Sequence, residues 1–319
     1  ELPLLGQKYY DVKSNPTAYS SSGFYFNWLV ENKINYNTTI KDAHSINVVL
    51  VQSAQKETYK GDNVTATDFP NDYIQTISGG TVTKGASDKT QWTIASYLAR
   101  MQYSYKGKYM ASAAIRADGS SRFGKNNRWG YFPSASLAWR ISGEDFFMKA
   151  KSLSFVDDLK LRASYGVTGN FQIGNYDHLS LMALDNYVLG TGNGQLVNGY
   201  KPSTIKNEDL SWEKNAMVNV GIDLQMFKGL LGLTVDYYNT NTSNMLLNVP
   251  VPHLTGYSTA LMNIGKVNNR GWEVALTSQK NITKDFGYSF NANYATNTNE
   301  VKALGPGNAP IISTGSVDH

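Results

Sequence analysis

The sequence has 319 residues, of which 41% are hydrophobic, 12% aromatic and only 17% charged, whereas soluble domains average about 25% charged residues. Its 28 glycines and 21 tyrosines disfavour a helical bundle, and its net charge of +4 comes from scattered basic residues, which disfavours nucleic-acid binding. The absence of cysteine excludes a disulfide scaffold, a thiolate zinc site and a cysteine nucleophile.

Segments of roughly ten residues alternate between apolar and polar side chains, which is the pattern of a transmembrane barrel strand. The clearest, residues 158–167, places Leu159, Leu161 and Ala163 on one face and Lys160 and Arg162 on the other. In chain order the predicted strands are residues 24–36, 45–56, 90–105, 109–116, 129–141, 158–167, 215–225, 231–237, 272–277 and 286–294. The pattern therefore predicts an all-β protein with about ten strands.

The connections between these strands alternate in length. Short connections are expected near residues 37–44, 106–108, 142–157, 227–230 and 279–285, and long ones near 57–89, 117–128, 168–213 and 239–265. Outer-membrane barrels have short periplasmic turns and long external loops, whereas a soluble sandwich has no reason to sort its loops in this way. We expect flexible loops at 189–199 and 239–244, and a short helix at 144–151.

Aromatic residues gather at the predicted strand ends, as in the interfacial girdles of membrane barrels. At the short turns these are Tyr103, Tyr105, Tyr109, Phe227, Phe286 and Tyr288, and at the long loops Trp129, Tyr131, Tyr237 and Tyr238. The alternative is that aromatic residues are simply good strand formers. No run approaches the ~18 apolar residues of a membrane helix, and the amino terminus lacks the features of a signal peptide.

A series of motifs carries a family resemblance. Residues 116–140 read RADGSSRFGKNNRWGYFPSASLAWR, and LKLRASYG (159–166), TGN (168–170), LSWEK (210–214), DYY (236–238), NIGKV (263–267) and NEV (299–301) follow in order. This series resembles the signature of SusC/RagA-type TonB-linked outer-membrane proteins of Bacteroidetes. The resemblance spans nearly the whole sequence.

The resemblance implies an antiparallel transmembrane β-barrel of 22 strands with a plugged lumen. It also implies a SusD-like surface lipoprotein as partner, an oligosaccharide or peptide ligand, and energy from the TonB–ExbB–ExbD complex acting on the plug. About ten strands cannot close such a barrel without unpaired edges in lipid. We therefore expect residues 1–319 to be one part of the barrel, with the plug and the remaining strands outside this sequence.

Several residues invite a chemical interpretation. Arg116, Asp118, Arg122 and Arg128 suit an anion or sugar-acid site, but a structural loop in which the arginines pair with Asp118 and its neighbours is the better interpretation. Gly190, Gly192 and Gly194 lack the lysine and the strand-to-helix context of a phosphate loop. The four histidines, His44, His178, His253 and His319, are too scattered to indicate a zinc site or a catalytic triad.

Asp157 and Asp158 are adjacent, so on a strand they point to opposite faces and cannot act as a glycosidase pair. Lys160, Arg162, Asn219, Asp223, Asn291 and Asn293 are expected to face a lumen, where they could touch substrate or plug, or simply line a polar interior. Tyr176, Tyr187, Tyr200 and Tyr257 could stack on sugar rings or anchor their loops. No catalytic, cofactor-binding or metal-binding residue is predicted, and no substrate-binding residue can be assigned.

The sequence thus predicts an outer-membrane nutrient importer and not an enzyme. A passive porin or adhesin barrel is the first alternative, distinguished by the absence of a plug and lipoprotein partner. A soluble β-rich carbohydrate-binding module or enzyme is the second, and it would not need detergent for extraction.

Overall fold

The computed structural model describes residues 16–71, 73–74, 76–190 and 194–304, and most of this described chain is strand. The long strands are β1 (Ala18–Ile40), β2 (His44–Thr67), β3 (Thr81–Tyr105), β4 (Tyr109–Ser120), β5 (Trp129–Arg140), β6 (Val156–Asn170), β11 (Glu213–Met226), β12 (Leu231–Pro250), β13 (Thr259–Asn281), β14 (Gly287–Ala295) and β15 (Thr298–Ala303). All ten predicted strands are confirmed. Among the described residues, no helix is long and apolar enough to cross a membrane.

Neighbouring strands follow chain order, β1-β2-β3-β4-β5-β6-β11-β12-β13-β14, in a single sheet. The pairs from β3 onward whose register is resolved are antiparallel. β15 continues along β13 beyond β14, after a break where the Thr296 amide donates to the Trp272 carbonyl at 2.8 Å. This meander arises because each connection, whether short or long, returns the chain antiparallel beside the strand before it.

The chain divides into two compact units. The first comprises residues up to Val30 together with Ala54–Thr93, and so holds segments of β1, β2 and β3 with the loop that carries the 3₁₀ turn η1 (Ile77–Gly79). In it, Glu57 accepts hydrogen bonds from Trp92 Nε1 at 3.0 Å and from Asn27 Nδ2 at 3.2 Å. The Tyr25 and Tyr59 rings lie 4.6 Å apart.

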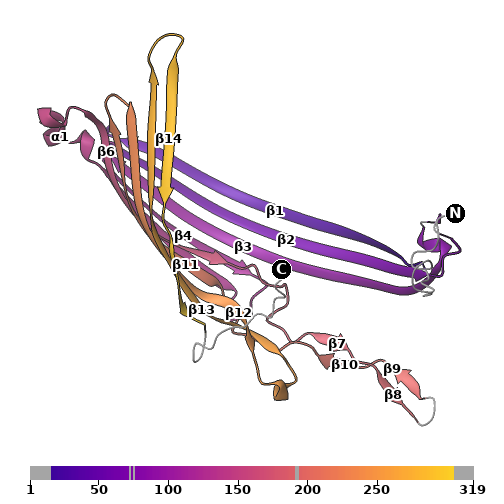
Figure 1. The fold of residues 1–319 in the computed structure, drawn as a ribbon. Helices are drawn as coiled ribbons and strands as arrows, with labels where there is room; N and C mark the ends of the chain where they lie inside the picture. Colours follow the sequence, from indigo (N-terminus) through magenta and orange to yellow (C-terminus); the bar gives the residue numbers. More distant parts are fainter. Residues whose placement is uncertain (1–15, 72, 75, 191–193, 305–319) are drawn as a thin grey trace. The chain divides into compact units, whose positions relative to one another are not determined.

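The second unit, Glu31–Ser53 with Ile94–His319, contains the remaining strands. Figure 1 shows β4, β6, β11, β12 and β13 side by side, with α1 (Asp145–Lys149) at the end of the short turns. At the other end the 171–212 connection carries two small hairpins, β7 (Met182–Leu184) with β10 (Tyr200–Pro202) and β8 (Tyr187–Leu189) with β9 (Gln195–Val197). α1 is flanked by the 3₁₀ turns η2 (Ile141–Gly143) and η3 (Lys151–Leu153), which confirms the predicted short helix; η4 (His253–Thr255) lies between β12 and β13.

The predicted alternation of connection lengths holds only in part. The connection 141–155, predicted short, is longer than the connection 121–128, predicted long, and two other long loops are shorter than predicted. β2 continues to Thr67 and β3 begins at Thr81, and β12 and β13 extend to Pro250 and from Thr259. The prediction of a flexible loop at 239–244 is wrong: these residues pair with β11 and β13. Two of their side-chain amides are held by the neighbouring strand, since Asn268 Nδ2 on β13 donates to Asn239 Oδ1 at 2.6 Å and to Asn241 Oδ1 at 2.8 Å.

The prediction of a flexible loop at 189–199 is also only partly right. Its ends lie in β8 and β9, which pair with each other, and residues 191–193 lie outside the described residues. Gly190 and Gly194 have positive φ angles of 103° and 40°, a backbone region where glycine carries no steric penalty. Gly190 and Gly194 therefore lie beside the paired strands β8 and β9, and neither precedes a helix as a phosphate loop would.

Candidate functional site

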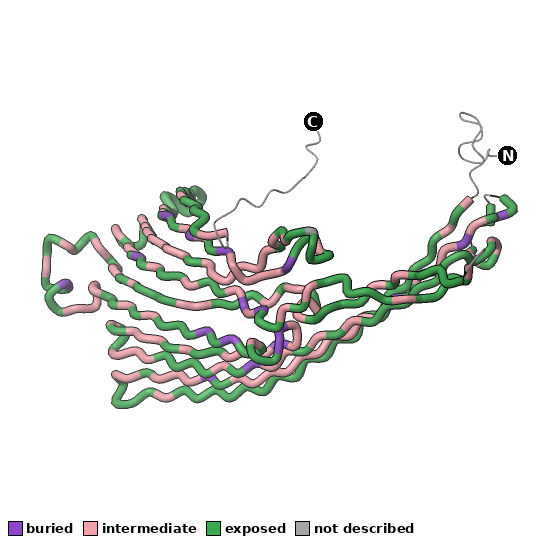
Figure 2. Tube along the Cα trace, turned by 90° about the horizontal axis from the view of Figure 1, so that it is seen from below, coloured by how far each residue is buried: buried purple, intermediate pink, exposed green. Residues whose placement is uncertain are grey.

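The register of the second unit sorts the side chains onto two chemically different faces. Tyr103, Ala111, Leu137, Ala163 and Val220 form one row across five neighbouring strands. Leu137 is 66% exposed and Val220 49% exposed, and within the described chain no second layer covers them. Figure 2 shows that most of the described trace is exposed or intermediate. A surface of this kind, here called the apolar face, fits hydrocarbon and not water.

The opposite surface, here called the polar face, has a different composition. One of its rows runs Ala138, Arg162, Gly221, Asp236 and Glu273 across β5, β6, β11, β12 and β13. All the residues predicted to face a lumen lie on this surface, namely Lys160, Arg162, Asn219, Asp223, Asn291 and Asn293. Their placement on one face of the sheet is confirmed.

Charged residues on the polar face form a connected network. Asp223 accepts from Lys160 Nζ at 2.8 Å and from Arg162 Nε at 3.0 Å, and the other end of the same guanidinium reaches Asp236 at 2.8 Å. Arg162 crosses β11 at Gly221, where an added Cβ would lie 2.8 Å from the guanidinium carbon and would overlap Asp236. Glycine is therefore needed here so that an arginine can bridge strands that are not neighbours.

Four buried side chains form a small core where the long loops meet the polar face. Phe123, Phe132, Leu210 and Trp212 constitute this loop core. The Trp212 ring lies 5.0 Å from Phe123 and 5.3 Å from Phe132, and its Nε1 donates to the Arg128 carbonyl at 3.0 Å. Because Phe132 belongs to β5 and the others to loops 121–128 and 171–212, the core fastens both loops to the sheet. The spaces that Cβ atoms would fill at Gly130 and Gly169 are occupied by the Phe132 ring.

The arginine-rich motif has a structural role in this arrangement. Asp118 is buried and accepts from Arg116 Nε at 2.7 Å, while Arg116 also reaches Ser96 Oγ at 3.3 Å. Arg122 donates to Asn175 Oδ1 at 2.9 Å and to the Phe171 carbonyl at 3.3 Å, and so ties the two loops together. The predicted pairing with Asp118 is confirmed for Arg116, whereas Arg122 pairs with the neighbouring loop.

The connection 141–155 between β5 and β6 is held by carboxylates. Asp158 accepts from Arg140 Nε at 2.8 Å and from the Ser142 hydroxyl, while Asp157 accepts the Gly229 amide of the next turn at 2.8 Å. The two aspartates are thus directed apart, as predicted. Glu144 accepts from Trp139 Nε1 at 3.1 Å and Lys108 Nζ at 3.3 Å. Hydrogen bonds from Tyr109, then Trp139 and Lys108, hold the pKa of Glu144 below its ordinary value.

The histidines serve local contacts. His44 Nδ1 lies 2.7 Å from the Tyr103 hydroxyl, and His178 Nδ1 lies 3.0 Å from the Arg122 carbonyl. No group of three or more metal-binding side chains occurs in the described part of the chain. The His253 side chain, His319 and Gly192 lie outside the described residues.

The external hairpins expose apolar and aromatic side chains. Tyr187 is 59% and Tyr200 64% exposed, whereas Tyr176 and Tyr257 are half-buried. Of the four loop tyrosines considered for sugar stacking, Tyr187 and Tyr200 therefore have accessible rings in this structure.

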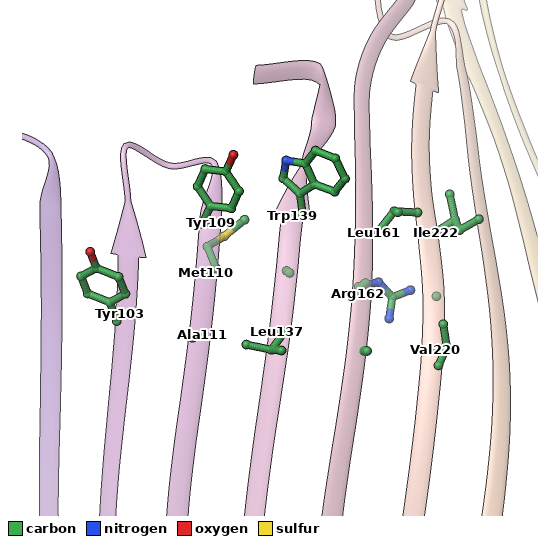
Figure 3. Close-up of a pocket in the computed structure, with 13 residues that line it drawn as sticks. Tyr103, Tyr109, Met110, Ala111, Leu137, Trp139, Leu161, Arg162, Val220 and Ile222 are labelled. Atoms are coloured by element: carbon green, nitrogen blue, oxygen red, sulfur yellow. The ribbon is translucent and has the colours of Figure 1, made fainter. Parts of the chain in front are cut away.

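Aromatic rings mark both ends of the apolar face. Tyr109 lies 6.4 Å from both Tyr105 and Trp139 beside the short turns, with the Trp139 ring nearly parallel to it. At the other end Tyr97 stacks on Trp129 at 6.0 Å, and the Tyr237 and Trp272 rings lie 4.9 Å apart. Figure 3 shows Tyr109 and Trp139 at the strand ends, above the aliphatic side chains.

One predicted member of the aromatic belts is wrongly placed. Tyr238 points to the polar face, where its hydroxyl donates to the Thr296 carbonyl at 3.3 Å. Strand alternation explains this, because adjacent Tyr237 and Tyr238 must face opposite sides.

A single antiparallel sheet with an apolar face, a polar face, two aromatic belts, short turns at one end and long loops at the other defines the wall of an outer-membrane β-barrel. Comparison with known proteins agrees. Residues 5–314 match the family model described as TonB dependent receptor-like, beta-barrel.

TonB-dependent receptor P39 of Formosa agariphila is 40% identical over 88% of this chain and 26% of its own length. TonB-dependent receptor SusC of Bacteroides thetaiotaomicron is 35% identical over 67% of this chain and 21% of its own. A solved structure of the RagAB peptide transporter superposes with a TM-score of 0.81 and 27% identity, covering 91% of this chain and 31% of that one.

The chain belongs to the TonB-dependent receptor β-barrel family, and within it to the SusC/RagA type. This is a family of outer-membrane transporters and not of enzymes. The chain spans about a quarter of the length of the curated relatives that it matches.

Sequence reasoning missed two features of this wall. The loop core has no periodic pattern in the sequence, because Phe123, Leu210 and Trp212 come from two loops. Only the bulk and apolarity of these side chains within polar segments indicated a core. Gly221 lies inside a clear strand, and an isolated strand glycine does indicate a close approach of other groups. That signal could have identified the Arg162 crossing.

Proposed function

We propose that this chain forms part of the wall of a TonB-dependent importer that carries oligosaccharides or peptides across the outer membrane, and that it does not act as an enzyme. The observation that carries the proposal is the charged polar face opposite an apolar face. Lys160, Arg162, Asp223 and Asp236 are neutralised by one another, so they can line a wet lumen at little electrostatic cost.

The whole transporter would contain parts beyond this wall. We infer further strands that complete a 22-stranded barrel, a plug in the lumen, and the TonB–ExbB–ExbD complex that acts on the plug. A SusD-like lipoprotein would close the external side. Similarity to SusC and to the RagAB peptide transporter supports these inferences.

Two features of the external loops suit ligand capture. The loop core fastens the bases of loops 121–128 and 171–212 to the wall, while the hairpins beyond it present Tyr187 and Tyr200 to solvent. Exposed aromatic rings can stack on sugars or on peptide side chains. The proposed ligand is thus an oligosaccharide or a peptide, and a measurement of uptake distinguishes the two classes.

The test is uptake by cells that lack the gene and by cells complemented with the full-length protein. Labelled oligosaccharides and labelled peptides are supplied separately, with and without a protonophore. An importer of this type loses uptake of one ligand class on deletion and again when the proton gradient collapses. Uptake that survives the protonophore would indicate a passive porin, and uptake unchanged by deletion would indicate an adhesin. Recovery of the protein without detergent would indicate a soluble module.

A further inference from the structure

A hollow of about 590 Å³ opens on the apolar face near the short turns. Its floor contains Ala111 and Ala163, and larger side chains surround them, namely Tyr103, Tyr109, Leu137, Trp139, Leu161, Val220 and Ile222. The volume lies in the range of small-molecule sites, about 300–1,000 Å³. Figure 3 shows the lining residues contributed by strands that lie side by side.

The cause of the hollow lies in the pattern of side-chain sizes. Along one cross-strand row, Ala111 and Ala163 flank Leu137, so small and large residues alternate. The next row toward the turns is Tyr105, Tyr109, Trp139, Leu161 and Ile222, all of them large. The hollow is therefore closed toward the turns by large side chains, and its chemistry is that of hydrocarbon.

A cation lies at the end of the aromatic row. Lys106 Nζ is 5.3 Å from the centre of the Tyr105 ring. The Tyr105 ring stacks on Tyr109, and Tyr109 stacks on Trp139. Lys108 is paired with Glu144, whereas Lys106 is exposed and forms no ion pair with any described residue. An exposed ammonium group at the level of an interfacial aromatic belt attracts an anionic headgroup.

We propose that this hollow is a binding site for one anionic glycerophospholipid of the periplasmic leaflet, with an acyl chain over Ala111 and Ala163 and the phosphate near Lys106. Short turns of such barrels lie on the periplasmic side, so a lipid in that leaflet meets the chain in this orientation. The site holds the wall at a fixed depth and is separate from the route of the imported ligand, which follows the polar face.

Native mass spectrometry of the full-length protein released from nanodiscs tests the proposal. The nanodiscs contain dioleoylphosphatidylcholine and about 10% dioleoylphosphatidylglycerol. We expect retained phosphatidylglycerol to exceed its bulk proportion by about fivefold, the preference that one lysine gives beside an anionic surface. Retention in bulk proportion would overturn the proposal.

Three variants locate the site. Lys106→Asn removes the charge while suiting the positive φ of 50° at this position, and we expect it to abolish the fivefold preference. Ala163→Leu fills the floor and is expected to do the same. Ala135→Leu adds the same side chain to the same face in the next row, outside the hollow, and must retain the preference. Equal retention in Ala163→Leu and Ala135→Leu would refute the site.

A second measurement identifies what covers the face. The fluorescence of Trp139 is obtained as the difference between the wild type and Trp139→Phe. Acyl-brominated phosphatidylglycerol should quench this fluorescence more strongly than brominated phosphatidylcholine does. Absence of quenching by both lipids would mean that protein, such as a second copy of the chain, covers the hollow, and would overturn the proposal. Uptake assays should be unchanged in Lys106→Asn, so failure of this proposal and of the proposed function remain distinguishable.

Discussion

Replacing Phe132 by alanine should release the external loops while leaving the sheet paired. Phe132 is 6% exposed, and its ring fills the space between Gly130, Gly169 and Trp212. Truncating a buried phenylalanine to alanine costs about 3–5 kcal/mol, because the ring loses its contacts and leaves a cavity. The loop core lies among water-exposed loops and not in lipid, so the hydrophobic effect applies to it in full.

A loss of about 3–5 kcal/mol raises the population of the opened loops by on the order of 10²- to 10⁴-fold. Limited trypsin digestion of the full-length protein, with mass-spectrometric detection of cleavage after Lys206, measures this population. Tyr131→Ala is the matched control, since Tyr131 is the adjacent residue, faces the other way and is 61% exposed. Cleavage of Phe132→Ala at a rate within twofold of the control would refute the role given to the loop core.

Two further perturbations follow from the wall and its turns. Gly221→Val should separate Arg162 from Asp236 across β11 and cost about 1–3 kcal/mol through overpacking, which lowers the midpoint of thermal unfolding. Gly166→Ala is the control, because its added Cβ would lie 3.5 Å from its nearest neighbour and should leave the midpoint unchanged. Equal midpoints for the two variants would contradict the crossing. Because the folded-state pKa of Glu144 is lowered from its ordinary value of 4.5, the ionised carboxylate stabilises the 141–155 connection at pH values above about 4.5. This contribution is lost as the pH falls through the lower folded-state pKa. Proteolysis of the connection should therefore increase in that acidic range in the wild type but show no such step in Glu144→Gln, and a step that persists in the variant would assign the transition to another group.

The strands could be predicted because their physical environment imposes a simple rule. A wall between lipid and water must alternate at every residue, so Leu159, Leu161 and Ala163 against Lys160 and Arg162 specify both the strand and its faces. The rule also explains the Tyr238 error, because clustering at strand ends was given more weight than parity.

The extensions of the strands were not predictable by the same rule. Beyond the membrane both faces meet water, so alternation disappears although the hydrogen-bonded ladder continues. Asn239 and Asn241 thus have a loop-like composition, yet their side chains pair with Asn268 across the β12–β13 ladder. The loop core was not predictable either, since Phe123 and Trp212 are 89 positions apart and come together only when both loops fold back.

Site-directed spin labelling tests the two-faced wall most directly. The chain contains no cysteine, so single cysteines can be introduced along β6 from Leu159 to Gly166 in the full-length protein with any other cysteines replaced. Labels at 159, 161, 163 and 165 should be accessible to oxygen in the bilayer, and labels at 160, 162, 164 and 166 to a water-soluble nickel complex. Accessibility without a period of two, or protection of both sets from oxygen, would contradict a wall with one side in lipid.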